Sequence, residues 1–209
     1  MTTGRHPTVE NHVYGAARDL AGAPRLQSLG KTALEQLGKH RDREFQRAFW
    51  DLLATLGESK GEDWATERLR ALMESARLTR ELVGYLDDLT FHVHDSVRAA
   101  YLRFAADALS GLLPPELERH VGFLLRRLPT SAASLLRRII LHKAANLPCH
   151  DVEACGVLNR LVDAGFASHR QVPSSTTIDG DAPGWIFVFE EGRRAALQRY
   201  VPLLRESES

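Results

Sequence analysis

The chain has 209 residues, of which 44% are hydrophobic and 26% charged, a composition typical of a folded globular protein rather than a disordered one. It has 27 basic and 27 acidic residues, so no net charge attracts the whole molecule to nucleic acid or to an anionic membrane. No apolar run reaches the length of a membrane span. The first residues form no apolar signal core, and the only two cysteines lie close together, so we expect a cytoplasmic protein.

Helical periodicity dominates the first 129 residues, because apolar side chains recur there at three- and four-residue spacing. This spacing predicts helices over about 26–37, 45–56, 64–86 and 97–109, the third being the longest. Pro115 opens a further helix, since the N–H groups of a first helical turn have no partner within the helix. We therefore expect an all-helical region over residues 1–129.

The pattern changes after Pro129. Thr130 or Ser131 is expected to cap a helix that runs to Lys143, and a second helix is expected from Asp151 to a left-handed stop at Gly165. Residues 166–172 and 185–189 have the composition of two paired strands, and the turn-forming residues 173–183 between them predict a loop. Residues 130–209 are therefore expected to form a second domain.

Two stretches of this second region carry a resemblance to a known fold: 161–166 (LVDAGF) and 190–194 (EEGRR). They resemble winged-helix domains, in which a helix ends in a Leu-x-x-x-Gly-hydrophobic turn, a two-stranded wing follows, and a Gly-Arg pattern opens the closing helix. The resemblance implies strands that cover the helices with Phe166, Ile186 and Val188.

One departure from this family stands out. Between Ile140 and Gly165 there is room for only one full helix after the first, so the positioning helix is absent or reduced to a turn around 145–150. This shortage argues against standard docking in the major groove. The predicted fold is therefore mainly α: an N-terminal helical region followed by a reduced winged-helix domain with one β-hairpin.

A second resemblance is more diffuse. The stretch LRRLPTSAASLLRRI, residues 125–139, with helices before it and a compressed wing after it, is similar to the Abi-alpha type of bacterial protein. Proteins of that type are known mainly as a domain of unknown function with a suggested link to phage abortive infection, so the resemblance implies such a link and supplies no catalytic residues. A role in bacterial regulation or defence is the expected setting.

Local charge decides whether the C-terminal region is expected to bind DNA. From residue 130 to the end there are nine Lys or Arg and nine Asp or Glu, and the predicted recognition helix has Asp151, Glu153 and Asp163 against Arg160. The candidates for nucleic-acid contact are Arg126, Arg127, Arg137, Arg138, Asn159, Arg160, Arg170, Arg193 and Arg194. The favoured interpretation is a solvated face in which many arginines pair with Glu116, Glu118 or Glu190. Protein contact is thus expected ahead of DNA contact.

Two clusters offer metal-binding chemistry. His92 and His94 precede Asp95, but on a helix side chains two apart point away from each other, so helix-end capping is favoured. His142, Cys149, His150 and Cys155 contain soft ligands without the paired spacing of structural zinc motifs, and buried cysteine packing is favoured.

Taken together, the residues predict a non-catalytic, cofactor-free binding protein with a protein partner. The alternatives that remain open are a DNA-binding transcriptional regulator, a metal-dependent enzyme centred on His92 and His94, and a homodimer of either binding type.

Overall fold

The computed structural model describes residues 23–38, 42–129, 132–141, 146–148, 152–171 and 185–204. This part of the chain is mainly helical, with a small antiparallel sheet near the C-terminus, which confirms the predicted fold class. The chain divides into two compact units: residues up to 92 with 105–110, and residues 93–104 with 111–209. The predicted division into an all-helical region over 1–129 and a second domain over 130–209 stays a prediction. No helix in the described ranges combines the length and the apolarity that a membrane crossing requires.

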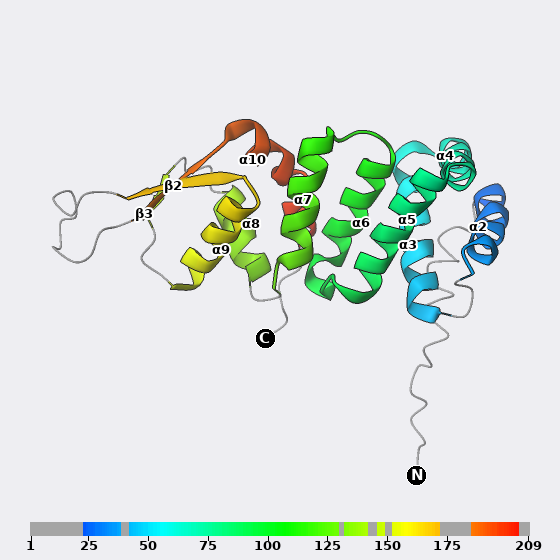
Figure 1. Cartoon of the computed structure of the whole chain (residues 1–209), viewed down its shortest axis with the longest axis horizontal. Coiled ribbons are helices and arrows are strands. Elements are labelled where there is room, and N and C mark those ends of the chain that lie inside the picture. The colour runs from blue at the N-terminus through cyan, green and yellow to red at the C-terminus, as the bar shows by residue number, and fades with distance from the viewer. Residues whose placement is uncertain are drawn as a thin grey trace, which may run out of the picture. The chain divides into compact units, whose positions relative to one another are not determined.

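Helix packing between sequence neighbours builds the first unit. It contains α2 (Pro24–Gln36), α3 (Arg43–Lys60), α4 (Glu62–Glu74) and α5 (Ala76–Phe91). α2 packs on α3 and α4, while α3 packs on α4 and α5, so each helix contacts the next and the next but one (Figure 1). Fully buried side chains from their facing sides form the core: Leu26, Phe45, Phe49, Leu52, Leu56, Leu69, Leu72, Leu82 and Leu86.

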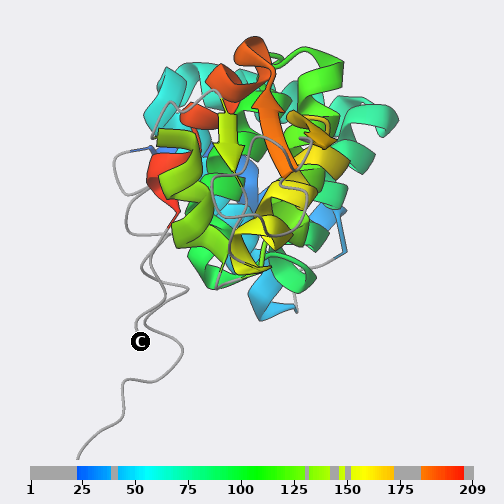
Figure 2. The same ribbon diagram turned by 90° about the vertical axis from the view of Figure 1, so that its left-hand side faces the viewer.

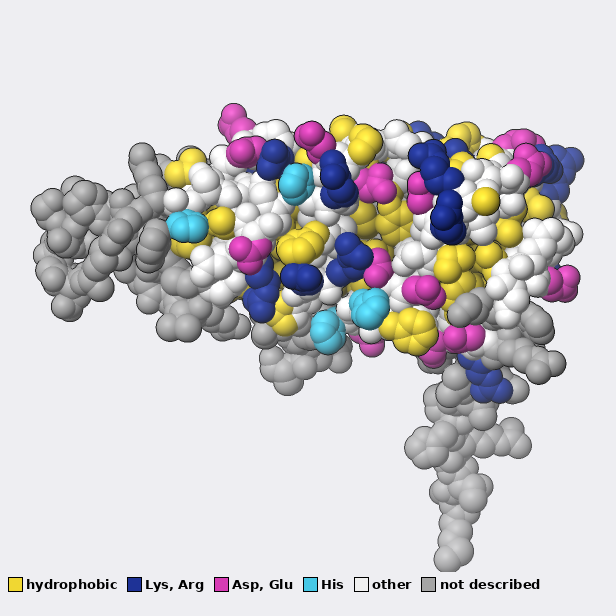
Figure 3. Space-filling model, viewed as in Figure 1, with side chains coloured by type: hydrophobic (Ala, Val, Ile, Leu, Met, Phe, Trp, Pro, Cys, Tyr) yellow, Lys and Arg dark blue, Asp and Glu magenta, His cyan; other side chains and the backbone are white. Residues whose placement is uncertain are grey.

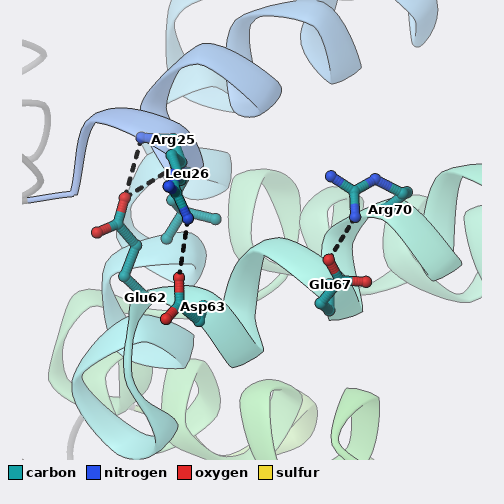
Figure 4. A network of polar contacts seen from close by, with 6 residues as sticks. All are labelled: Arg25, Leu26, Glu62, Asp63, Glu67 and Arg70. Carbon is teal, nitrogen blue, oxygen red and sulfur yellow. Dashed lines mark hydrogen bonds and ion pairs between the residues drawn. The ribbon is translucent and has the colours of Figure 1, made fainter.

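A carboxylate of α4 caps the start of α2. Oε1 of Glu62 accepts hydrogen bonds from the backbone N–H groups of Arg25, at 2.9 Å, and Leu26, at 3.4 Å. Figure 4 shows this cap beside the exposed ion pair between Arg25 and Asp63. Pro24 begins α2, and Ala23 supplies no side-chain cap, so the first-turn N–H groups are satisfied from another helix.

The single long helix predicted over 64–86 is wrong. The structure has two helices there, because Ser75 lies in an extended conformation between α4 and α5. The Ser75 hydroxyl accepts from the N–H of Leu78 at 3.4 Å, and the Thr79 hydroxyl donates to the carbonyl oxygen of Leu72 at 2.8 Å. Side chains that bond nearby backbone groups in this way compete with the helical ladder. Gly84, which interrupts the apolar spacing in the sequence, lies within α5.

The second unit contains α6 (Asp95–Leu109) only as far as residue 104, followed by the rest of the chain. Its further elements are α7 (Pro115–Arg127), α8 (Ala132–Leu141), β1 (Asn146–Pro148), α9 (Val152–Asp163), β2 (Ala167–Gln171), β3 (Trp185–Phe189), α10 (Glu191–Gln198) and the 3-10 helix η2 (Val201–Leu203). α8 packs against α9, α10 and η2, and α7 packs against α10. The predicted caps Thr130 and Ser131 and the loop 173–183 lie outside the described residues.

The sheet has the order β1-β3-β2, and both pairings are antiparallel (Figure 2). The β2–β3 hairpin confirms the predicted pair of strands. The positioning helix was predicted to be absent or reduced to a turn around 145–150. The described residues there, 146–148, form neither a helix nor a turn but β1, which adds a third strand to the free edge of β3.

The expected inward face of β3 was also misassigned. Phe187 is buried, whereas Val188 is only half-buried, because successive side chains of a strand point to opposite faces. Phe166 is buried as expected, and the side chain of Ile186 lies outside the described part.

Gly165 ends α9 as predicted. Its φ is +75°, its N–H donates to the carbonyl oxygen of Val162, and the N–H of Phe166 donates to that of Leu161. This pair of hydrogen bonds is the Schellman arrangement, and the side chains of Phe166 and Leu161 are both buried. The turn directs the chain from α9 into β2.

Candidate interaction surface of the second unit

Arg194 of α10 lies inside the unit, with 7% of the residue exposed. Its Nη2 donates to the carbonyl oxygens of Ile140 at 3.1 Å and Ile139 at 3.5 Å. Both carbonyls belong to the last turn of α8, where they have no partner within the helix and where a cation is favoured. The guanidinium also lies 5.1 Å from the ring centre of Phe189 on β3. Arg194 therefore joins α8, β3 and α10.

Arg193, the neighbour of Arg194 on α10, bonds the turn that follows α9. Its Nη1 donates to the carbonyl oxygen of Gly165 at 2.6 Å, and its Nε lies 3.0 Å from a carboxylate oxygen of Glu190. The pairing of an arginine with Glu190 was expected. Because one guanidinium bonds both the α9–β2 turn and the residue before α10, Arg193 fixes the path of the chain around the hairpin.

His120 of α7 packs against the same turn. Its ring lies edge-on to Phe166 with centroids 6.2 Å apart. A Cβ built on Gly165 would lie 2.9 Å from Cε1 of His120 and 3.0 Å from Nη1 of Arg193. A side chain here would displace these groups and would also be strained by the φ of +75°, so α7, the end of α9 and α10 meet at Gly165.

One face of α7 remains on the surface. We call Arg119, His120, Phe123, Arg126 and Arg127 the α7 stripe, because positions three and four apart share a helix face. Its three arginines are exposed, while His120 and Phe123 are half-buried. The guanidinium of Arg127 lies over the ring of Phe123, 4.3 Å from its centre. In Figure 3, dark-blue and cyan side chains gather around exposed hydrophobic ones over α7.

The remaining predicted residues lie on α8, α9 and β2. Arg138 on α8 and Asn159 on α9 are exposed, whereas Arg137 and Arg160 are half-buried. Arg170 belongs to β2, but its side chain lies outside the described part. That these nine residues form a nucleic-acid site stays a prediction. To the predicted Arg126 and Arg127, the structure adds three neighbours on the same face of α7: Arg119, His120 and Phe123. The three- and four-residue spacing of these five positions in the sequence was sufficient to indicate a shared helix face.

The metal candidates do not gather into a donor set in the described chain. His92 follows the last residue of α5 and donates its backbone N–H to the carbonyl oxygen of Asp88, and the carbonyl oxygen of His94 accepts from the N–H of Val97. Both histidines are exposed. Among the side chains that can be described, no three from His, Cys, Asp and Glu are grouped to hold one ion. His142, Cys149, His150 and the side chain of Cys155 lie outside the described residues.

Comparison of the chain with models of known protein families, with curated proteins and with solved structures finds no match to any of them. Any functional conclusion therefore depends on the chain's own residues.

Proposed function

We propose that this chain is a non-catalytic binding protein whose C-terminal region is a reduced winged-helix domain that contacts another protein. The winged-helix resemblance is supported by the helix that ends at Gly165, the β2–β3 hairpin and the closing helix α10, which follow one another as the resemblance implies. The Abi-alpha resemblance suggests bacterial regulation or phage defence as the setting of this contact.

The bonding of both α10 arginines to other groups of the same unit is the observation that carries the proposal. Arg194 is buried against the end of α8, and Arg193 bonds Gly165 and Glu190. A DNA-binding surface needs cations that reach phosphate oxygens. The two adjacent arginines that the sequence offers for this purpose instead hold the fold of the unit together.

The exposed residues of α9 also favour a protein partner over DNA. Its exposed residues include Asn159 and Asp163, while Arg160 is half-buried. An exposed carboxylate repels phosphate, and one partly buried arginine supplies little compensation. With balanced charge over residues 130–209, recognition through shape and hydrogen bonds with a protein is favoured.

Site-specific photo-crosslinking in cells that naturally make the protein tests this proposal. A photoreactive phenylalanine analogue replaces Asn159 on α9 or Ser168 on β2, both exposed, and replaces exposed Glu67 on α4 as the matched control. We expect adducts from the first two positions that protease removes and nuclease does not. Adducts removed by nuclease would instead show a DNA-binding domain, and adducts from Glu67 alone would place recognition in the first unit.

DNA binding is the second candidate, since Arg126, Arg127 and Arg138 are exposed. These residues lie on α7 and α8 rather than on the predicted recognition helix. A DNA-binding function would therefore use the phosphate backbone and would vary little with base sequence.

A further inference from the structure

We infer that the α7 stripe binds a short acidic segment of the protein partner. The inference rests on the proposed function and deepens it, because it assigns a surface and a partner chemistry. The stripe unites the features that such a segment requires: exposed cations, a half-exposed aromatic ring between them, and a rigid helix that presents both.

The buried side of α7 fixes the orientation of the stripe. Val121, Leu124 and Leu125 are buried, and a side chain on Gly122 would meet the ring of Phe104 at 2.9 Å. His120, a half-buried member of the stripe, packs edge-on against Phe166 with ring centroids 6.2 Å apart. The helix therefore cannot rotate to bury Phe123 without losing these contacts.

Arg127 and Phe123 form the centre of the proposed contact. The guanidinium of Arg127 lies over the Phe123 ring, which limits its positions, and its planar fork of N–H groups can bond a carboxylate in a bidentate way. Phe123 is only half-buried, so it can contact an apolar side chain of the same segment. Acidic residues beside an apolar one match this pair.

The charge of the stripe argues against a second copy of the chain as the occupant. The same face of α7 has three arginines and, one turn before Arg119, a single carboxylate at Glu116. Two such faces would bring arginines together with too few carboxylates to compensate them. An acidic partner meets no such repulsion.

The length of the stripe argues for a short segment rather than nucleic acid. From Arg119 to Arg127 the helix rises about 12 Å, which matches about four residues of extended chain. Exposed carboxylates lie beyond it, at Glu116 on α7 and at Asp163, two residues before the Gly165 that contacts His120. A long polyanion would run onto these carboxylates, and three arginines fall short of the roughly six to ten phosphate contacts of a typical DNA-binding protein.

Fluorescence anisotropy with the full chain tests the inference. The probe is a labelled peptide of about twelve residues in which pairs of Glu flank Leu, and the matched peptide has Gln at every Glu. We expect the acidic peptide to bind and the Gln peptide to bind at least about tenfold more weakly, equivalent to 1.4 kcal/mol. Arg127→Glu should weaken acidic-peptide binding at least about tenfold, and Arg127→Lys should weaken it less, because the charge remains but the stacked fork is lost.

Arg80→Glu is the control. Arg80 is exposed on α5 and donates its Nε to the carbonyl oxygen four residues earlier, as Arg119 does on α7. We expect this variant to bind the acidic peptide as the parent chain does. Circular dichroism should show that both reversals remain folded.

Three results would overturn the inference. These are equal binding of the acidic and Gln peptides, equal weakening by Arg80→Glu and Arg127→Glu, and tighter binding of a single-stranded oligonucleotide or a duplex than of the peptide at the same salt concentration. If crosslinking from Asn159 still captures protein in such a case, only the assignment of the α7 stripe fails. If that crosslinking captures DNA, the proposed function itself fails.

Discussion

The guanidinium of Arg194 donates to the carbonyl oxygen of Ile140, 54 positions earlier in the sequence, at 3.1 Å. A cation from the closing helix thus satisfies the end of α8, a task that a glycine or a local side chain usually performs. This contact explains why an arginine in a basic-looking helix is buried, and it links the charge pattern of the C-terminus to its stability.

Removing the Arg194 side chain should destabilise the second unit. Arg194→Ala leaves the carbonyls of Ile139 and Ile140 without their donor and opens space beside Phe189. We expect the free energy of unfolding to fall by about 2–3 kcal/mol. Urea denaturation followed by circular dichroism measures it. Arg138→Ala, at an exposed position on α8, should change it by less than about 0.5 kcal/mol; equal effects would mean that the buried contact contributes nothing.

Two glycines of the second unit should respond in opposite directions to alanine. At Gly165 the φ of +75° and the close approach of His120 and Arg193 oppose any Cβ, so we expect Gly165→Ala to cost about 1–3 kcal/mol. At Gly156 in α9 an added Cβ has no neighbour within 4 Å, so Gly156→Ala should stabilise by about 0.5–1 kcal/mol. Thermal melts of the two variants check the signs. A neutral Gly165→Ala would show that the turn is not held as described.

Two glycines of the first unit should also respond in opposite directions to alanine. An added Cβ on Gly30 would lie 2.7 Å from Cζ3 of Trp50, whose ring is buried between α2 and α3, whereas one on Gly84 meets nothing within 4 Å. We expect Gly30→Ala to cost about 1–3 kcal/mol through overpacking. Gly84→Ala should stabilise by about 0.5–1 kcal/mol. Tryptophan fluorescence during denaturation reports on both, and a stabilising Gly30→Ala would disprove the packing of α2 on Trp50.

The cap that Glu62 supplies to α2 should be measurable against its neighbour. Glu62→Ala removes the acceptor of the Arg25 and Leu26 N–H groups, and we expect a loss of about 0.5–2 kcal/mol. Asp63→Ala removes only an ion pair whose carboxylate side chain is 90% exposed, and we expect almost no change. Hydrogen exchange of the first α2 amides should quicken in Glu62→Ala alone. The reverse order of effects would mean that surface charge, not the cap, holds α2.

Local sequence signals were sufficient for most of the fold. Helical spacing located α2, α3 and α6, Pro115 located the start of α7, and the single glycine at 165 located the end of α9. These features depend on residues within one or two turns, which the sequence shows directly.

Other features depend on partners distant in the sequence. β1 is a short stretch ending in Pro148, and only the edge of β3 makes it a strand. At Ser75 the apolar helical pattern continues without interruption, and the only local sign of the break is a serine whose hydroxyl caps the next helix. The burial of Arg194 depends on α8, so sequence reasoning counted that arginine with the exposed cations.

The most direct test of the central claim, that the closing-helix arginines serve the fold rather than DNA, is a titration of the full chain with a labelled mixed-sequence duplex. Anisotropy is measured at about 50 mM and about 200 mM salt, a range over which a DNA-binding protein with six to ten phosphate contacts loses about 10³- to 10⁵-fold in affinity. We predict weak binding that changes by less than about tenfold over this range, since Arg193 and Arg194 are bonded within the unit and the α7 stripe offers three exposed arginines, fewer than six phosphate contacts. Tight binding at the lower salt that collapses at the higher, and that Arg194→Ala or Arg193→Ala abolishes without unfolding the chain, would contradict the account.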